Sequence, residues 1–309
     1  PYFEGILTKF TVPEELFGPP NPKLLREQGV YQIITSGKLP EAVLAFITEI
    51  FKGSSAILNS LLTILNERRF FDGQRFVETP LWTLFGDSNE IPEEPELQAL
   101  FDRFHYRLWN QYLPSEKWDE YLDYYWLAHS QKFQPIKVDF KVIEEAHQKL
   151  WSINPLTLKD KLMTILKRLE DHGIQVSDRR KGRCLITLAA SAILAGRSYV
   201  APEDLLSLKW VIPSREEEVK VVEQTIIDIA GASIKARQQL RELIPQIQGL
   251  IEELENADFK QALKIAEKLS PLKQKYADVK DAAEGTDEAA EVDRLLREFT
   301  RKLTQKIAQ

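Results

Sequence analysis

Apolar positions in the first hundred residues change repeatedly between the spacing of a strand and the spacing of a helix. Short continuous or alternating apolar runs predict strands over residues 2–10, 30–34, 42–48 and 81–86. From Ser54 to Phe70 the apolar residues recur every three or four positions, which predicts a helix. A short helix followed by an alternating strand is expected over 97–113. This order predicts an α/β fold with a parallel sheet.

From about residue 115 to the end, the apolar spacing is helical throughout. The middle of the chain predicts an all-helical second domain, and longer, more polar helices after about residue 233 predict a helical hairpin or three-helix extension. Pro271 is expected to break or kink one of these helices. The expected division is an α/β subdomain over 1–128, a helical subdomain over 129–229 and the extension over 230–309.

Composition narrows the class of protein. The 309 residues carry a net charge of -6, which argues against nucleic acid as a partner. A single cysteine excludes an intramolecular disulfide framework, four scattered histidines suggest no metal site of their own, and no apolar run is long enough to span a membrane. A cytoplasmic protein is expected. The aromatic residues between 109 and 151 are expected to pack in the core and between domains.

Two polar side chains are expected at the carboxyl ends of neighbouring strands. Glu49 follows the apolar run "AVLAFIT", and Asn89 belongs to "FGDSNE" after the next strand. Ligands bind at this edge of open α/β sheets, and a carboxylate there can polarise a water for attack on a phosphate. Each residue also has a plain interpretation, since strand-end acids are common and an asparagine often makes a turn after a strand.

Three arginines are further candidates for phosphate contacts. Arg103, in "FDRFHYRL", is placed to reach a neighbouring subunit, or else pairs with a nearby acid on the surface. Arg179 and Arg180 follow the helix start "SD", where either Ser177 or Asp178 is the expected cap. Cations are disfavoured at a helix N-terminus, so two arginines there favour a bound anion.

Together these stretches resemble a known family. The segments "LTKFTVPEELFGPP", "SGKLPEAVLAFITEIFKGSSAILNSLLTILNERRF", "LFGDSNEIPE", "LFDRF" and "VSDRRKGR" occur in the order found in MoxR-type AAA+ ATPases, particularly the RavA branch. The resemblance covers roughly residues 1–212. It implies an AAA+ parallel-sheet core that lacks its first strand here, followed by an all-helical lid and a helical extension.

The resemblance also implies a function and roles for individual residues. Its members bind and hydrolyse ATP with Mg²⁺ and assemble as rings, here expected to be hexamers. They remodel or chaperone a client protein, often with a partner that carries a von Willebrand A domain. Glu49 would be the Walker B glutamate, Asn89 sensor 1, Arg103 the arginine finger and Arg179, with Arg180 adjacent, sensor 2. The tract "NERRFFDGQRFVETP" resembles the hairpin that extends toward the ring pore.

Two features depart from the family pattern. Thr48 stands where an aspartate is expected to hold magnesium, and hard cations prefer carboxylate ligands. Hydrolysis is therefore expected to be weakened, unless another acid such as Asp87 compensates. In addition, the pair Gly37-Lys38 lacks the spacing of a phosphate loop. We therefore expect an upstream segment to supply that loop and the first central strand, the alternative being a strand from a partner chain.

Two functions from different classes follow from these features. The first is an ATP hydrolase that drives remodelling of a client, and the intact set of Glu49, Asn89 and the arginines favours it. The second is a structural or adaptor subunit that does not hydrolyse ATP, which Thr48 favours. A motor that moves on nucleic acid is a distant third, because the chain is acidic.

Overall fold

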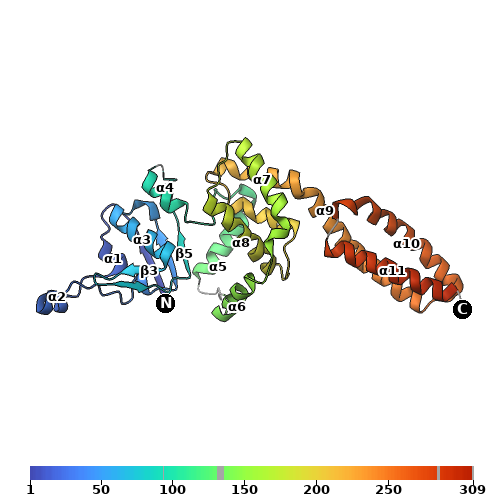
Figure 1. The fold of residues 1–309 in the computed structure, drawn as a ribbon, viewed down its shortest axis with the longest axis horizontal. Helices are drawn as coiled ribbons and strands as arrows, with labels where there is room; N and C mark the ends of the chain where they lie inside the picture. Colours follow the sequence, from blue (N-terminus) through green and yellow to red (C-terminus); the bar gives the residue numbers. More distant parts are fainter. Residues whose placement is uncertain (93, 131–135, 284–285, 308–309) are drawn as a thin grey trace. The chain divides into compact units, whose positions relative to one another are not determined.

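The computed structural model describes residues 1–92, 94–130, 136–283 and 286–307 (Figure 1). The chain divides into two compact units, Pro1–His105 and Tyr106–Gln309. Each unit has hydrophobic side chains of its own at its centre, and the second unit contains two such cores. The two units are described separately below.

A parallel three-stranded sheet forms the centre of the first unit, as the sequence predicted. Its strands are β1 (Tyr2–Ile6), β2 (Leu44–Thr48) and β5 (Thr83–Gly86), in the order β1-β2-β5. The helices of this unit are α1 (Pro13–Phe17), α2 (Pro22–Gln28), α3 (Ser55–Glu67) and α4 (Pro95–Phe101). The apolar stripe of α3 includes Ile57, Leu61 and Ile64, which are fully buried against the sheet residues Ala45 and Ile47 in one core. β2 is the middle strand, because it pairs with β1 on one side and with β5 on the other.

The expected hairpin before sensor 1 is present as β3 (Arg69–Phe71) and β4 (Phe76–Glu78), which pair antiparallel. Residues 30–34, however, are not a strand. The Ile33 amide donates to Asp72 in the hairpin at 2.7 Å, and the next amide, that of Ile34, donates to Pro19 at 2.8 Å. Neighbouring backbone groups are thus satisfied by different segments, so no continuous ladder forms.

The strand expected at the end of 97–113 is also not formed. The helix of that segment is present as α4, but residues after it pack on the helical subdomain instead of on a strand. The Arg107 amide donates to the Trp210 carbonyl at 2.9 Å, and its buried guanidinium donates to the Pro213 carbonyl at 3.1 Å. A strand requires a hydrogen-bonded neighbour, and these bonds hold the backbone elsewhere.

The first part of the second unit is helical, as predicted. It contains α5 (Trp118–His129), α6 (Phe140–Leu150), α7 (Lys159–Asp171), α8 (Asp178–Leu194) and the 3₁₀ helix η5 (Pro202–Trp210). The apolar faces of α7, α8 and η5, together with the end of α6, share one core with the start of α9 (Glu216–Glu255). Cys184 is fully buried there, and burial raises the pKa of its thiol to about 12. The thiol therefore stays protonated and serves as a small apolar group.

The aromatic residues of α5 correct the sequence-based expectation that they are core residues. Trp118 is 58% exposed and Trp126 is 74% exposed, and no side chain of α5 is buried. Trp151, after α6, is also exposed. Aromatic residues in a helix are buried only where another apolar surface packs against them, and clustering in sequence does not show whether such a surface exists.

A three-helix bundle forms the extension, as predicted. It consists of the second half of α9, α10 (Phe259–Val279) and α11 (Asp287–Ile307), and both α10 and α11 pack beside α9 (Figure 1). Pro271 lies inside α10 without ending it. Buried residues on both sides of the proline, including Leu269 and Leu272, keep α10 on the bundle. None of the described helices is long and apolar enough to cross a membrane.

A charge cluster of four residues connects this extension with the helices that precede it, which form the expected lid. We use this name for Glu203 from η5, Arg237 and Arg241 from α9, and Glu288 from α11. Arg237 is 2% exposed and pairs with Glu288 at 2.6 Å and with Glu203 at 3.2 Å. Arg241 contacts the same two carboxylates at 3.0 and 2.7 Å. The cluster lies where α9 passes from the lid core to the bundle core.

Candidate nucleotide-hydrolysis site

The carboxyl ends of β2 and β5 bring the predicted site residues together. These strands are parallel neighbours, with Ile47 opposite Gly86 in the register. The next residue on each strand is Thr48 on β2 and Asp87 after β5, so both lie at the same edge of the sheet. Glu49 and Asn89 follow immediately. The sequence-based prediction that Asp87 ends an adjacent strand is thereby confirmed.

Glu49 has an uncommon backbone conformation. Its φ of 54° and ψ of 46° are left-handed, which costs a residue with a Cβ roughly 1–2 kcal/mol. Its amide donates to Asp87 Oδ1 at 2.8 Å, and the amide of Ile50 donates to the Asp87 carbonyl at 3.0 Å. Strain of this kind is concentrated at functional sites, because only the surrounding structure keeps it in place.

The side chain of Glu49 is held at one of its two oxygens. Asn89 Nδ2 donates to Glu49 Oε1 at 2.9 Å, and Lys52 Nζ lies 3.2 Å from the same oxygen. The other oxygen, Oε2, is buried and has no hydrogen-bond partner among the described residues. This arrangement fixes the direction of the carboxylate and leaves one buried oxygen without a hydrogen bond from the described residues.

Lys52 is a site residue that the sequence analysis missed. Its position three residues after Glu49 was the available signal, and the ion pair forms across the short 3₁₀ helix η2 (Ile50–Lys52). The Lys52 side chain is 40% exposed. It supplies a positive charge at an edge that otherwise carries two carboxylates, those of Glu49 and Asp87.

Thr48 ends β2 with a neutral side chain. Its carbonyl accepts the Leu7 amide at 2.9 Å, so its backbone has the regular sheet role. The described residues contain no group of three or more acidic, histidine or cysteine side chains that could hold a metal by themselves. Magnesium in nucleotide sites commonly takes one or two carboxylates together with phosphate oxygens. Glu49 and Asp87 fit that smaller requirement.

The structure places Arg103 at the end of α4. Its Nε donates to Asn66 Oδ1 at 3.0 Å, and its Nη1 donates to the Ala99 carbonyl. The guanidinium is therefore held between the ends of α3 and α4, in the same unit as Glu49. The described contacts join it to these two helices and not to Glu49 or Asn89.

The two lid arginines have different surroundings. Ser177 is the cap of α8, because its Oγ accepts the Arg180 amide at 3.3 Å. Arg180 is only 3% exposed and donates through Nη1 to the Val211 carbonyl, so its role in the structure is to hold the lid together. Arg179, by contrast, is exposed in the first turn of α8. Of the pair, Arg179 is the side chain that a nucleotide could reach.

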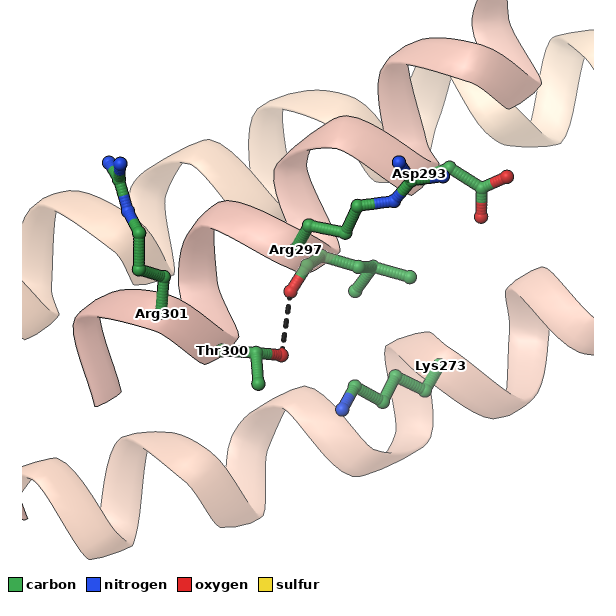
Figure 2. A pocket seen from close by; sticks show the side chains of 6 residues that line it. Lys273, Asp293, Arg297, Thr300 and Arg301 are labelled. Atoms are coloured by element: carbon green, nitrogen blue, oxygen red, sulfur yellow. Dashed lines mark hydrogen bonds between the residues drawn. The ribbon is translucent and has the colours of Figure 1, made fainter. Parts of the chain in front are cut away.

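A separate groove lies in the extension, between α10 and α11 (Figure 2). Its charged lining residues are Lys273, Asp293, Arg297 and Arg301. In Figure 2 the Arg301 side chain points away from the helix that carries Lys273. Thr300 bonds to the Leu296 carbonyl of its own helix at 2.8 Å. The cations of this groove do not converge on one point, and the site at the sheet edge remains the better candidate.

Comparison with solved structures supports an AAA+ fold. The chain resembles the crystal structure of a candidate ATPase from Cytophaga hutchinsonii with a TM-score of 0.56, over 74% of this chain and 76% of that one, at 18% sequence identity. An AAA lid domain model matches residues 157–226. The α/β core and helical lid are therefore those of an AAA+ ATPase.

Sequence comparison identifies the family within that class. The model of the MoxR domain in the MoxR-vWA-beta-propeller ternary systems matches residues 1–148. Two uncharacterised proteins of Methanocaldococcus jannaschii, MJ0812 and MJ0079, are each 34% identical to the chain. The matches cover 91% and 84% of this chain and 77% and 67% of those proteins. The chain belongs to the MoxR-type AAA+ ATPases, a family whose members bind nucleotide.

Proposed function

We propose that this protein hydrolyses ATP with magnesium and that Glu49 activates the attacking water. The observation that carries this proposal is the hydrogen bond from Asn89 to Glu49 Oε1 at 2.9 Å, at the carboxyl edge of the sheet. This bond brings the side chains of Glu49 and Asn89, both predicted from the sequence, into direct contact. A carboxylate held in this way can polarise a water for attack on a terminal phosphate, while the asparagine amide orients it.

Bound magnesium-ATP would supply the transferable phosphoryl group and the metal charge. Thr48 would offer the metal a neutral oxygen, while the carboxylate of Glu49 would act on the attacking water. In this proposal Arg179 contacts the terminal phosphate from the lid, and Arg103 acts on the site of a neighbouring subunit. Arg180 supports the lid helix that carries Arg179. The expected phosphate loop from an upstream segment remains a prediction.

The proposed biological role is chaperone-like remodelling of a client protein by a ring, with six subunits expected. The description of the matching family supports a partner with a von Willebrand A domain and a third component with a β-propeller. Assignment to the RavA branch and a cytoplasmic location are parts of the same proposal. The two-part core and lid supply what such a ring needs, because motion between them can transmit hydrolysis to a client.

The experiment is phosphate release by the full-length protein and its Glu49→Gln variant. Glutamine keeps the size of the side chain and an oxygen for Asn89, but it is a poor base. We expect the turnover rate to fall by roughly 10²- to 10⁴-fold while ATP still binds. Glu27→Gln, an equal change on exposed α2, is the control and should keep the normal rate. Equal rates for Glu49→Gln and the unmodified protein would refute the assignment.

A second function is favoured by one observation, the neutral side chain of Thr48. In this alternative the protein is a structural or adaptor subunit of the ring, in which bound nucleotide stabilises subunit contacts without being hydrolysed. The unmodified protein would then release no phosphate, so Glu49→Gln would cause no change. Nucleotide would still promote ring assembly. Measurement of ring formation beside phosphate release separates the two functions.

A further inference from the structure

The backbone of Glu49 depends on a carboxylate from the neighbouring strand end. Asp87 Oδ1 accepts the Glu49 amide at 2.8 Å. The backbone of Asp87 also bonds to residues before and after Glu49. Its amide donates to the Ile47 carbonyl at 3.2 Å, and its carbonyl accepts the Ile50 amide at 3.0 Å. Asp87 therefore makes hydrogen bonds to three backbone groups around Glu49: the carbonyl of Ile47 and the amides of Glu49 and Ile50.

These bonds explain how a residue with a side chain stays in the left-handed region. The Asp87 carbonyl accepts the amide of Ile50, and the Glu49 amide has the Asp87 side chain as its acceptor. A carboxylate is a strong acceptor for an amide, because its charge assists the bond. Without that acceptor, a return to ordinary extended or helical backbone would be favoured, and the Glu49 side chain would point elsewhere.

The other end of Glu49 is held independently. Asn89 and Lys52 both contact Oε1 and hold the carboxylate. The bond from the Glu49 amide to Asp87 holds the backbone. From this geometry we infer that Asp87 is a positioning residue for Glu49: it holds the left-handed turn that directs the carboxylate toward Asn89. The inference rests on the proposed catalytic role of Glu49.

A different role for Asp87 must be separated from this one. Asp87 follows β5 at the register position beside Thr48, so its carboxylate could instead hold magnesium in place of the expected aspartate. Asparagine distinguishes the roles, because its side-chain oxygen can still accept the Glu49 amide but it lacks the charge that magnesium prefers. Alanine removes both functions.

The experiment compares Asp87→Asn with Asp87→Ala in the full-length protein, measuring kcat and KM for ATP and binding of Mn²⁺ in the presence of nucleotide. We expect Asp87→Ala to lower kcat by roughly tenfold or more with KM and Mn²⁺ binding little changed, since a misplaced catalytic group loses rate without losing substrate. Asp87→Asn should keep most of the normal kcat. An unchanged kcat in Asp87→Ala, or equal losses with weaker Mn²⁺ binding in both variants, would overturn the inference.

Two controls make the result specific. Asp72, in the β3–β4 turn, accepts the amides of Gln74 and Arg75 at 2.8 and 2.9 Å, so Asp72→Ala removes similar bonds away from Glu49. It should leave kcat unchanged, and thermal unfolding of each variant shows whether the fold is intact. Glu49→Gln tests the underlying function separately. If that variant is inactive and Asp87→Ala is fully active, the positioning role alone is wrong.

Discussion

Two groups of charged side chains in this molecule share a local pattern but differ in their surroundings. At the sheet edge, Glu49 Oε1 has two partners and Oε2 has none; in the charge cluster, Glu288 Oε1 accepts from Arg237 and Arg241 while its Oε2 has no hydrogen-bond partner in the described part of the chain. An unpartnered carboxylate oxygen therefore does not by itself mark a functional site.

Charge balance separates the two groups. In the charge cluster, two carboxylates face two guanidiniums. Burial tends to raise the pKa of Glu288, but the bond from Arg237 and a backbone amide outweigh it, and the pKa lies below the usual value. At the sheet edge, Glu49 pairs with the ammonium of Lys52, and the carboxylate of Asp87 accepts the Glu49 amide without a cation beside it in the described structure. That edge has negative charge available for a cation, and the cluster does not.

Backbone strain separates them as well. Glu288 lies in the first turn of α11, a regular helix whose N-terminus favours an acidic residue. Glu49 lies in a left-handed conformation that its own side chain disfavours. The comparison teaches that the charge cluster has balanced charges on regular backbone, whereas the sheet edge keeps backbone strain, which is concentrated at functional sites.

The largest expected effect comes from the charge cluster. Arg237→Ala leaves the buried Glu288 and the partly exposed Glu203 with one cation between them, so the free energy of unfolding should fall by about 3–5 kcal/mol in urea titrations. Arg294→Ala is the control, because that arginine is exposed and pairs with Glu291 on the surface. It should change stability little, because exposed ion pairs are screened by solvent. Similar losses in both variants would contradict the structural role of the cluster.

A smaller effect is expected from adding a carboxylate to the sheet edge. Thr48→Asp should lower the magnesium concentration that gives half-maximal hydrolysis by roughly tenfold, equivalent to about 1.4 kcal/mol. The physical reason is that a charged oxygen replaces a neutral one beside Glu49 and Asp87. Thr48→Asn has a similar size without the charge and should behave like the unmodified protein. If Thr48→Asp gives no change, magnesium binding is not limited at this position.

The smallest effect tests the strain at Glu49. A left-handed backbone costs a non-glycine residue roughly 1–2 kcal/mol, and the greater chain entropy of glycine offsets roughly 0.5–1 kcal/mol of the gain. Glu49→Gly should therefore stabilise the protein by about 0.5–1 kcal/mol in thermal or urea unfolding while abolishing hydrolysis. Arg68, the other residue with a side chain and a positive φ in the described structure, provides the matched control. Arg68→Gly should give a similar gain with normal hydrolysis.

The sequence predicted most of the regular elements, because hydrophobic periodicity reports burial directly. β2, α3 and β5 were located, and with them the meeting of Glu49 and Asn89 at one edge. Residues 30–34 and 104–113 were wrongly expected to be strands, since alternation alone cannot show whether a neighbouring strand is available. The burial of Arg180 was not foreseen either, because its acceptor, the Val211 carbonyl, is distant in sequence.

Long-range polar contacts explain the remaining differences. Arg237 and Glu288 lie 51 residues apart, and nothing in local periodicity relates them. The left-handed turn at Glu49 was equally hidden, because glycine, the usual signal for that conformation, does not occur there. Contacts of this kind depend on tertiary structure, whereas the spacing of apolar residues is visible in the chain itself.

The continuity of α9 gives the extension a mechanical property. Its 40 residues, with Pro245 inside the helix, correspond to a length of about 60 Å, with its first part in the lid core and its second part in the bundle core. Each degree of rotation at the lid end therefore displaces the far end by roughly 1 Å. The helix connects the lid core to the bundle core like a lever arm, so that a rotation of the lid core moves the far end of the bundle through a larger displacement.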